Sequence, residues 1–448
     1  MKLQAILENF AYRSKHLIHI FLCIIAVFYF NNCLADDKNV ITISEGLRLA
    51  TDHNRLIKIA SLSKDIASAD TSIARSGLLP SINASLNQTY LARQPGARFG
   101  SLKAFLAEKD SLSYGINIYQ TIYDFGANLS RYEASKTNLD LTKLDIVRVK
   151  NLVALDFINA YFDLLETEKM VLVAEKEVER FTLHLKVTQS FYEEGVITKN
   201  DLLQAEVMLS DARQRLLTMT NRRSLNISNI NSILARPIYA CVEVVDAPAT
   251  TSQVIELEKA WDTAGKERSE IKIIDHQLRI LDFQETAVRS EYYPTLFAQG
   301  GYNYTENRYQ FPTDNWSLIF GVHLNVFSGG STRAGVSKVL YEREQLLEQK
   351  KKLIDDINLE VEKSYLDLKN ALEKIEVTKD AVSQGEENVR INKIRYEEGV
   401  GTSTDVVDAI TLLTTAETNY YRAVYELQRA GAGLRYAMGL DLVSTYSY

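Results

Sequence analysis

Tyr192-Glu193-Glu194-Gly195-Val196 recurs in the second half of the chain as Tyr396-Glu397-Glu398-Gly399-Val400. The two copies are 204 residues apart (396 − 192 = 204), and at the same separation Asp201 corresponds to Asp405. A repeat of ~200 residues is too long for a solenoid unit. The sequence therefore predicts one duplicated domain, whose two halves have the same build.

A second set of matches covers the front of each repeat. Ile57-Lys58-Ile59 corresponds to Ile271-Lys272-Ile273, and Pro80 to Pro294, at a separation of 214 residues (271 − 57 = 214). This separation exceeds the first by ten residues (214 − 204 = 10), so the first repeat contains a longer loop than the second. The flanking matches place that loop between Pro80 and Tyr123.

The N-terminus has the pattern of a secretory signal. Lys2, Arg13 and Lys15 precede an apolar run from Leu17 to Phe30, and small residues end at Ala35. The run is shorter than the ~20 residues of a membrane-spanning helix, which favours cleavage after residue 35 over an uncleaved anchor. No other stretch is apolar enough for a transmembrane helix.

These patterns divide the chain into four segments. Residues 1–35 are the signal peptide, and residues 36–238 form the first repeat, with a β-hairpin near 80–123. Residues 239–256 form an irregular connector. Residues 257–448 form the second repeat, with a β-hairpin near 294–327.

Long stretches without Pro or Gly predict unusually long helices. One runs from residue 128 to 192, and the other from 337 to 396, interrupted only by Gly385. Two apolar seams on the first helix favour packing against two neighbours, while a single broad amphipathic face is the alternative. Shorter helices at 44–75 and 201–235 together match the length of one long helix, so they can run beside it.

Four segments alternate between apolar and polar residues and predict strands at 82–90, 112–122, 295–305 and 316–326. Four strands cannot close a barrel, and open edges are not tolerated in lipid. Two copies would give eight strands with a filled interior, whereas three copies give twelve strands and an aqueous pore. A soluble sandwich is the alternative, which the long helices disfavour. Polar residues suited to a pore are Asn83, Ser85, Asn117 and Asn325.

Further motifs lie where the predicted elements join. Tyr123-Asp124-Phe125-Gly126 and Phe327-Ser328-Gly329-Gly330 occupy the strand-to-helix joins, and Leu234-Ala235-Arg236-Pro237-Ile238 ends the first repeat. Together with the duplicated turn and the two prolines, these motifs resemble those of the TolC-type outer-membrane efflux and secretion channels. The resemblance implies an α+β membrane protein: a homotrimer in which a twelve-stranded β-barrel is continuous with a long periplasmic α-helical barrel.

The same resemblance implies a function. The chain would be the outer-membrane exit duct of a tripartite efflux pump or type I secretion system. Its partners would be two further copies, a periplasmic adaptor (membrane fusion) protein, an inner-membrane ABC, RND or MFS transporter, and outer-membrane lipid. A non-channel periplasmic coiled-coil structural or adaptor protein is the alternative, which would share the long helices but not the four strands.

In this family the periplasmic entrance lies at the helical turns, where acidic residues ring the pore. The resemblance assigns Asp405 and Asp408 to that ring, and Asp201 and Tyr396 to the contacts that tie the closed entrance together. Gly401 departs from the pattern, because the best-known members carry an arginine at its place. Crowding of carboxylates in a trimer would raise some of their pKa values.

The residues themselves allow a plainer interpretation of the same turns. Gly195 and Gly399 are predicted to end the long helices in the left-handed conformation. Asp201 and Asp405 then open return helices, where an aspartate can simply cap the helix and favour its N-terminal dipole. Asp408 lies three residues further, on the same helix face as Asp405.

The sequence predicts no enzymatic chemistry. His53, His184, His276 and His323 are scattered, without the spacing of a metal-ligand pair, and no nucleophile motif is present. We therefore expect no metal, no cofactor and no catalytic residue. The net charge of −7 also gives no support to nucleic-acid binding, which needs a basic face.

Overall fold

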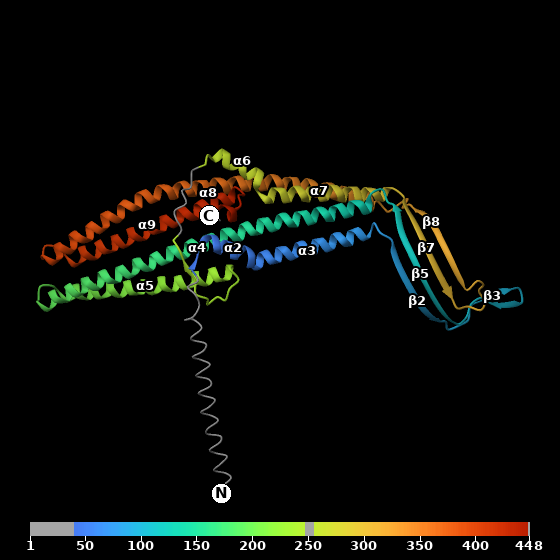
Figure 1. The fold of residues 1–448 in the computed structure, drawn as a ribbon, viewed down its shortest axis with the longest axis horizontal. Coiled ribbons are helices and arrows are strands. Elements are labelled where there is room, and N and C mark those ends of the chain that lie inside the picture. Colours follow the sequence, from blue (N-terminus) through green and yellow to red (C-terminus); the bar gives the residue numbers. More distant parts are fainter. Residues whose placement is uncertain (1–39, 247–254, 447–448) are drawn as a thin grey trace, which may run out of the picture. The chain divides into compact units, whose positions relative to one another are not determined.

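The two halves of the chain contain the same main elements in the same order (Figure 1). The computed structural model describes residues 40–246 and 255–446, so the predicted signal peptide lies outside the described residues. The first half contains α3 (Arg55–Ser76), β2 (Ser81–Tyr90), β5 (Asp110–Tyr123), α4 (Ala127–Glu193) and α5 (Lys199–Ile233). The second half contains α7 (Ser269–Arg289), β7 (Thr295–Thr305), β8 (Asp314–His323), α8 (Ser331–Glu397) and α9 (Ser403–Ala437).

The described residues form two compact units. The strand unit consists of residues 56–150 and 261–360 and holds the four long strands. The helical unit consists of the described residues of 1–55, 151–260 and 361–448 and holds both helical turns. Within residues 40–246 and 255–446, none of the helices combines the length and the apolar character needed to span a membrane.

α4 and α8 are each 67 residues long, which confirms the two long helices. In the helical unit, Glu177 of α4 pairs with Arg215 of α5 at 2.8 Å, and Arg180 of α4 pairs with Glu417 of α9 at 2.9 Å. α4 therefore packs against two neighbours, and the prediction of two seams is correct. The buried side chains include Ile158, Phe162 and Leu165 of one seam and Phe157 and Leu164 of the other.

The continuous helix predicted at 44–75 is wrong, because α2 (Ile43–His53) and α3 are separated at Asn54. Asn54 has φ −60° and ψ 136°, and its side-chain amide donates to the Ile233 carbonyl at 2.8 Å. The second half breaks at the equivalent position (54 + 214 = 268), where Arg268 separates α6 (Leu257–Glu267) from α7. Buried Arg268 pairs with Glu360 at 2.8 Å. A polar side chain that bonds another helix thus marks each break.

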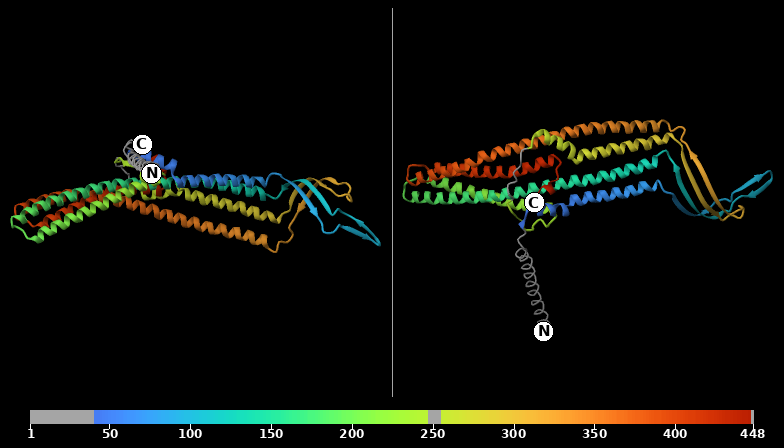
Figure 2. Two further views of the ribbon diagram at one scale, coloured as in Figure 1. Left: turned by 90° about the horizontal axis from the view of Figure 1, so that it is seen from below. Right: turned by 45° about the horizontal axis from the view of Figure 1, so that its top comes forward.

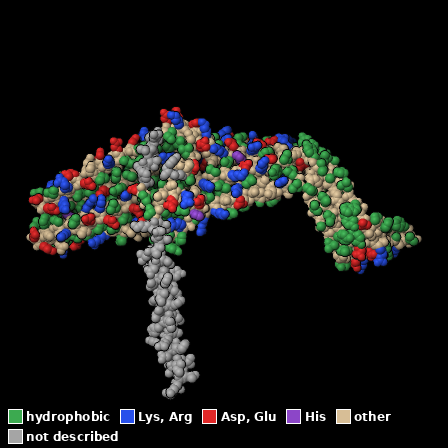
Figure 3. All heavy atoms as spheres, in the orientation of Figure 1, with side chains coloured by type: hydrophobic (Ala, Val, Ile, Leu, Met, Phe, Trp, Pro, Cys, Tyr) green, Lys and Arg blue, Asp and Glu red, His purple; other side chains and the backbone are tan. Residues whose placement is uncertain are grey.

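The four long strands form one antiparallel sheet in the order β2-β5-β7-β8, which confirms the four predicted strands. The register separates the two faces cleanly. One row across the sheet is Ile82, Ile118, Gly300 and Leu318, and the next row, on the other face, is Asn83, Asn117, Gly301 and Ser317. Hydrophobic side chains dominate the visible face of the strand region (Figure 3). The sheet is therefore apolar on one face and polar on the other.

The last predicted strand is too long at its C-terminal end. The alternating pattern continues to residue 326, but β8 ends at His323, so Asn325 lies beyond the sheet. Gly329 and Gly330 have φ of 64° and 87°, in the left-handed region that glycine tolerates. The backbone leaves the sheet here to turn into α8.

Two pairings of short strands were not expected from the sequence. The extra loop of the first repeat contains a hairpin of β3 (Gly96–Phe99) and β4 (Leu102–Phe105). The connector is not wholly irregular, because β6 (Glu243–Val244) pairs in parallel with β1 (Val40–Ile41). The hydroxyl of buried Tyr161 joins this pair, since it lies 2.6 Å from the Val245 carbonyl oxygen and 3.2 Å from that of Ile41.

A glycine sets how closely α2 approaches α4. A Cβ atom added to Gly46 would lie 2.0 Å from the ring of Phe157, whose side chain is fully buried. We therefore expect Gly46→Ala to destabilise the helical unit by about 1–3 kcal/mol, as overpacked cores do. Thermal unfolding followed by far-UV circular dichroism measures this change.

Gly265 of α6 provides the matched control, because an added Cβ would meet nothing within 4 Å. Gly265→Ala should be neutral or stabilising by up to ~1 kcal/mol, since alanine favours helix more than glycine does. Equal unfolding midpoints for the two variants would show that Phe157 does not set the α2–α4 distance.

Candidate functional site

Both helical hairpins turn with the same backbone geometry. Gly195 and Gly399 each have φ of 74°, in the left-handed region. The Val196 amide donates to the carbonyl of residue 191 at 2.8 Å, and the Val400 amide donates to that of Arg395 at 2.9 Å. These bonds satisfy carbonyl groups that the last helical turn leaves unpaired. Backbone hydrogen bonds therefore close the start of both turns, 194–198 and 398–402.

Asp201 and Asp405 cap the helices that follow the two turns. The carboxylate of Asp405 accepts the Thr402 amide at 2.9 Å, and the Thr402 hydroxyl accepts the Asp405 amide at 3.2 Å. In the first turn, Asp201 accepts the amide and the hydroxyl of Thr198 at 3.1 and 2.8 Å. Within one chain, both aspartates make the helix-capping contacts of the plainer interpretation.

The electrostatic environment of Asp405 within one chain opposes the expected pKa shift. The Thr402 amide, the Thr402 hydroxyl and the nearby Arg395 guanidinium lower the pKa of the Asp405 carboxyl. Carboxylate crowding would raise it, so the chain on its own favours the ionised form. Arg395 is a candidate that the comparison of the two repeats missed, because the corresponding residue of the first repeat is Phe191 (395 − 204 = 191).

Asp408 lies one turn further into α9 and is exposed. Its side chain makes no hydrogen bond or ion pair with any other residue of the described ranges. Val406 and Val407 are buried beside it, at 3% and 4% exposure, so the backbone that carries Asp408 is firmly packed. The carboxylate is thus presented to solvent from a rigid helix.

Tyr396 lies inside the helical unit and is 4% exposed. Its hydroxyl donates to the Thr188 hydroxyl at 3.3 Å, and Thr188 in turn donates to the His184 carbonyl at 2.9 Å. The ring of Tyr396 lies 5.3 Å from the rings of both His184 and Phe191. Tyr396 therefore ties α8 to α4 just before the α8–α9 turn.

His184 completes this polar contact in an otherwise apolar region. Its Nε2 atom lies 2.9 Å from the Ser403 hydroxyl, which links α4 to the start of α9. Burial lowers the pKa of His184 to about 4, so the imidazole is neutral at neutral pH. From the sequence, His184 was only one of several scattered histidines. Its importance could have been recognised from its place near the C-terminal end of α4, which packs against Ser403 at the start of α9.

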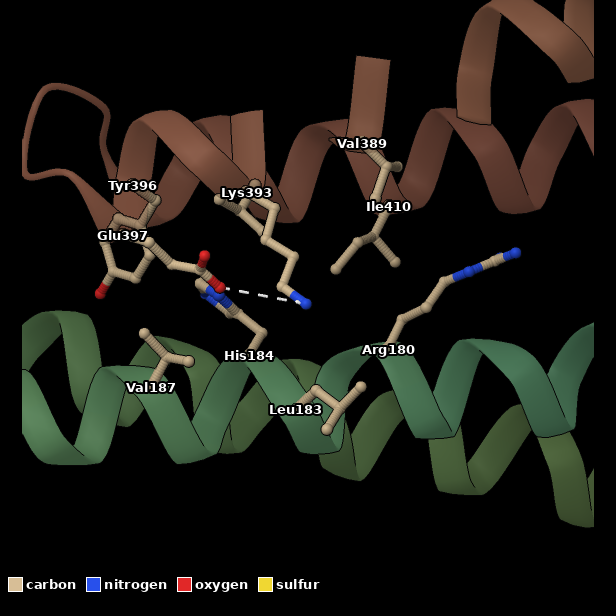
Figure 4. A pocket seen from close by; sticks show the side chains of 10 residues that line it. Arg180, Leu183, His184, Val187, Val389, Lys393, Tyr396, Glu397 and Ile410 are labelled. Atoms are coloured by element: carbon tan, nitrogen blue, oxygen red, sulfur yellow. Dashed lines mark ion pairs between the residues drawn. The ribbon is translucent and has the colours of Figure 1, made fainter. Parts of the chain in front are cut away.

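A cavity of about 130 Å³ lies between these helices. Figure 4 shows Tyr396 and Lys393 on one side of it and His184 and Leu183 on the other. Lys393 and Glu397 form an ion pair of 3.9 Å at its edge. No group of His, Cys, Asp and Glu side chains in the described ranges could hold a metal ion.

Gly401 fits its position closely. Its amide donates to the Arg395 carbonyl at 2.9 Å. An added Cβ would lie 3.1 Å from the Arg395 Cβ and 3.1 Å from the Tyr396 nitrogen. A larger residue here must displace the end of α8 by a few tenths of an ångström.

The comparisons with known proteins agree with this architecture. The family model described as "Outer membrane efflux protein" matches residues 46–236 and 262–440. The chain belongs to this family. The family consists of channels rather than enzymes, and its two matched segments coincide with the two halves that contain the same elements.

Named relatives of the family cover most of the chain at low identity. The alkaline protease secretion protein AprF of Pseudomonas aeruginosa is 21% identical over 423 residues, which are 91% of this chain and 86% of AprF. The toluene efflux pump outer membrane protein TtgC of Pseudomonas putida is 21% identical over 379 residues, 82% of this chain and 76% of TtgC. Among solved structures, the Campylobacter jejuni CmeC outer membrane channel has a TM-score of 0.78 at 15% identity, covering 89% of this chain and 85% of CmeC.

These findings confirm the location and the role expected from the resemblance. The protein is an outer-membrane channel with a periplasmic portion, and it acts as the exit duct of an efflux or type I secretion system. The alternative of a non-channel periplasmic adaptor is not favoured. The four-stranded sheet, apolar on one face, is the membrane part that such an adaptor would lack.

The buried histidine makes the helical unit sensitive to acid. In the unfolded chain His184 has a pKa of ~6.5, whereas in the folded chain its pKa is about 4. As the pH falls through this window, the unfolded chain binds a proton that the folded chain does not, so stability is lost. The loss is ~3 kcal/mol once the pH reaches the folded pKa.

We expect the thermal midpoint of the helical circular dichroism signal to fall between pH 7 and pH 4.5, and His184→Gln to remove part of that fall. His276→Gln is the control, because His276 is only half-buried on α7. If His184→Gln retains the full pH dependence of the parent, another group is responsible.

Proposed function

We propose that three copies of the chain assemble around one continuous pore, with the turns 194–198 and 398–402 at its periplasmic entrance. The observation that carries this proposal is the open four-stranded sheet. β2 and β8 are its outer strands, and among the described residues each pairs with a long strand on one side only. In lipid, the free backbone groups of both edges need partners.

Closure by further copies satisfies those edges. Because β2-β5-β7-β8 alternate in direction, β8 of one copy and β2 of the next are also antiparallel. Two copies would give an eight-stranded barrel whose interior side chains fill. Three copies give twelve strands, and the row of Asn83, Asn117 and Ser317 would line an aqueous lumen.

At the entrance, we assign different roles to the two candidate ring aspartates. Asp408 is exposed and bonds no other residue that the structure describes, so it is the carboxylate that sets the charge of the opening. Asp405 contributes charge as well, but it also caps α9. Tyr396 holds α8 to α4, and Asp201 holds the first turn in shape.

The partners follow from the duct function. A periplasmic adaptor protein and an inner-membrane ABC, RND or MFS transporter would deliver cargo to the entrance. The chain itself would carry no enzymatic activity and no cofactor. What supports this is the family membership, together with relatives whose names include both protease secretion and toluene efflux.

The oligomeric state is the direct test of the proposal. Native mass spectrometry of the full chain in mild detergent should give three times the mass of the mature chain, and unheated electrophoresis should give a form that boiling converts to the monomer. A folded monomer or dimer as the largest species would contradict the proposed barrel, because its edges would remain open.

The charge at the entrance is tested most cleanly by Asp408→Asn, which leaves the Asp405 cap intact. Loss of one carboxylate per copy should lower the cation-over-anion permeability ratio in planar bilayers, on the order of two-fold. Asp405→Asn should have a similar effect and should also lower the thermal midpoint, because it weakens the cap of α9.

Asp380→Asn is the matched control. Asp380 is exposed on α8, about 27 Å along the helix before residue 398 at 1.5 Å per residue. Its substitution should leave selectivity unchanged. If Asp408→Asn and Asp380→Asn conduct alike, Asp408 does not line the constriction.

A further inference from the structure

The β3–β4 hairpin has no equivalent in the second half of the chain. Residues 91–109 separate β2 from β5, whereas only residues 306–313 separate β7 from β8. The hairpin projects past the end of the four-stranded sheet in all three views, on the side away from α3 and α4 (Figures 1 and 2). Since the helices are periplasmic, the hairpin lies on the outer-leaflet side of the membrane.

The base of the hairpin is anchored to the β7–β8 loop. The ring of Phe105 lies 6.2 Å from that of Tyr309, and the Gln94 side chain donates to the Tyr309 hydroxyl at 3.3 Å. Arg308 pairs with Glu108. The hairpin is thus held in a defined place, and Glu108 is already occupied by a partner outside the hairpin.

The hairpin carries two cations directly opposite each other. In its register Arg98 pairs with Lys103, and both side chains are exposed. Like charges at directly opposite positions destabilise a strand pair. Neither side chain forms an ion pair with any residue of the described ranges, and residues 91–107 contain no Asp or Glu. The pair therefore lacks an anion.

The opposite face of the hairpin is apolar. Phe99 and Leu102 form the neighbouring pair of the register and are 66% and 67% exposed. A two-stranded hairpin is marginally stable in water unless its apolar face is covered. A basic face and an apolar face on one exposed element are the combination that binds at a lipid interface, with the long basic side chains reaching the headgroups.

We propose that the β3–β4 hairpin binds an anionic glycolipid of the outer leaflet, with Arg98 and Lys103 sharing one headgroup phosphate and Phe99 and Leu102 entering the interfacial region. Arginine and lysine both donate charge-assisted hydrogen bonds to phosphate oxygens. Contact between the hairpins of two copies fits less well, because it would bring the same two cations of each copy together. Free phosphate would leave the apolar face uncovered.

The test uses the purified full chain in a zwitterionic detergent, titrated with lipid A and followed by a fluorescent lipid A analogue. R98Q/K103Q should weaken lipid A binding at least ten-fold, and F99S/L102S should also weaken it. K363Q/K369Q is the control, because it removes two exposed cations of α8 that form no ion pair among the described residues. Its affinity should stay within two-fold of the parent.

Two further measurements in the same titration identify the ligand. Dephosphorylated lipid A should bind more weakly than lipid A, and millimolar inorganic phosphate should not displace it. The proposal is overturned if R98Q/K103Q binds lipid A like the parent while its heat-modifiable form shows that it is folded. Displacement by inorganic phosphate alone, with no effect of F99S/L102S, would overturn it in favour of a phosphate site. A change of oligomer mass in the hairpin variants, with lipid affinity unchanged, would overturn it in favour of contact between copies.

Discussion

The backbone of a strand in lipid has nowhere to place an unpaired amide or carbonyl group, and much of this molecule follows from that constraint. One chain supplies four strands with an apolar face, but it leaves β2 and β8 at open edges. The same register that gathers Ile82, Ile118 and Leu318 on one face gathers Asn83, Asn117 and Ser317 on the other. Such a sheet needs further strands to pair its two edges. Its apolar face indicates the side that contacts lipid, and its polar face the side that contacts water.

The helices are subject to a different constraint. Water can hydrogen-bond the free backbone groups at their ends, but their apolar seams must pack against other helices. α4 reaches its length without a single central core by packing against α5 and α9 in the helical unit. Polar side chains mark where the shorter helices stop: Asn54 bonds the end of α5, and Arg268 bonds Glu360 of α8. A buried polar group needs a hydrogen-bond partner. These residues therefore define the alignment of the paired helices more precisely than apolar contacts would.

The sequence predicted the features that repeat and missed those that depend on partners distant in sequence. Period-two alternation located all four long strands, and the absence of Pro and Gly located α4 and α8. The break at Asn54 was missed because its cause is the carbonyl of Ile233, 179 residues away. The candidate site shows the same division between what the sequence predicts and what it misses. The positions of Tyr396 and Asp405 in the turn could be read from the repeat, whereas the contact of His184 with Ser403 requires α4 and α9 to lie together. A ring formed between copies is beyond what one chain can display.

Asp405 shows how one carboxylate can serve both folding and a proposed pore. Its oxygen accepts the Thr402 amide, and this contact, more than any other, keeps the carboxyl ionised. In a trimer, three such groups would repel one another and oppose that ionisation. The capping hydrogen bond therefore offsets the repulsion between carboxylates and fixes the position of the Asp405 side chain. Asp408 has no such bond to the part of the chain that the structure describes. The proposed ring therefore combines one carboxylate whose ionised form is stabilised by its helix and one whose ionisation depends on its neighbours in the assembly. On this view, the two aspartates differ most in how they respond to acid and to cations, although they lie on the same helix face.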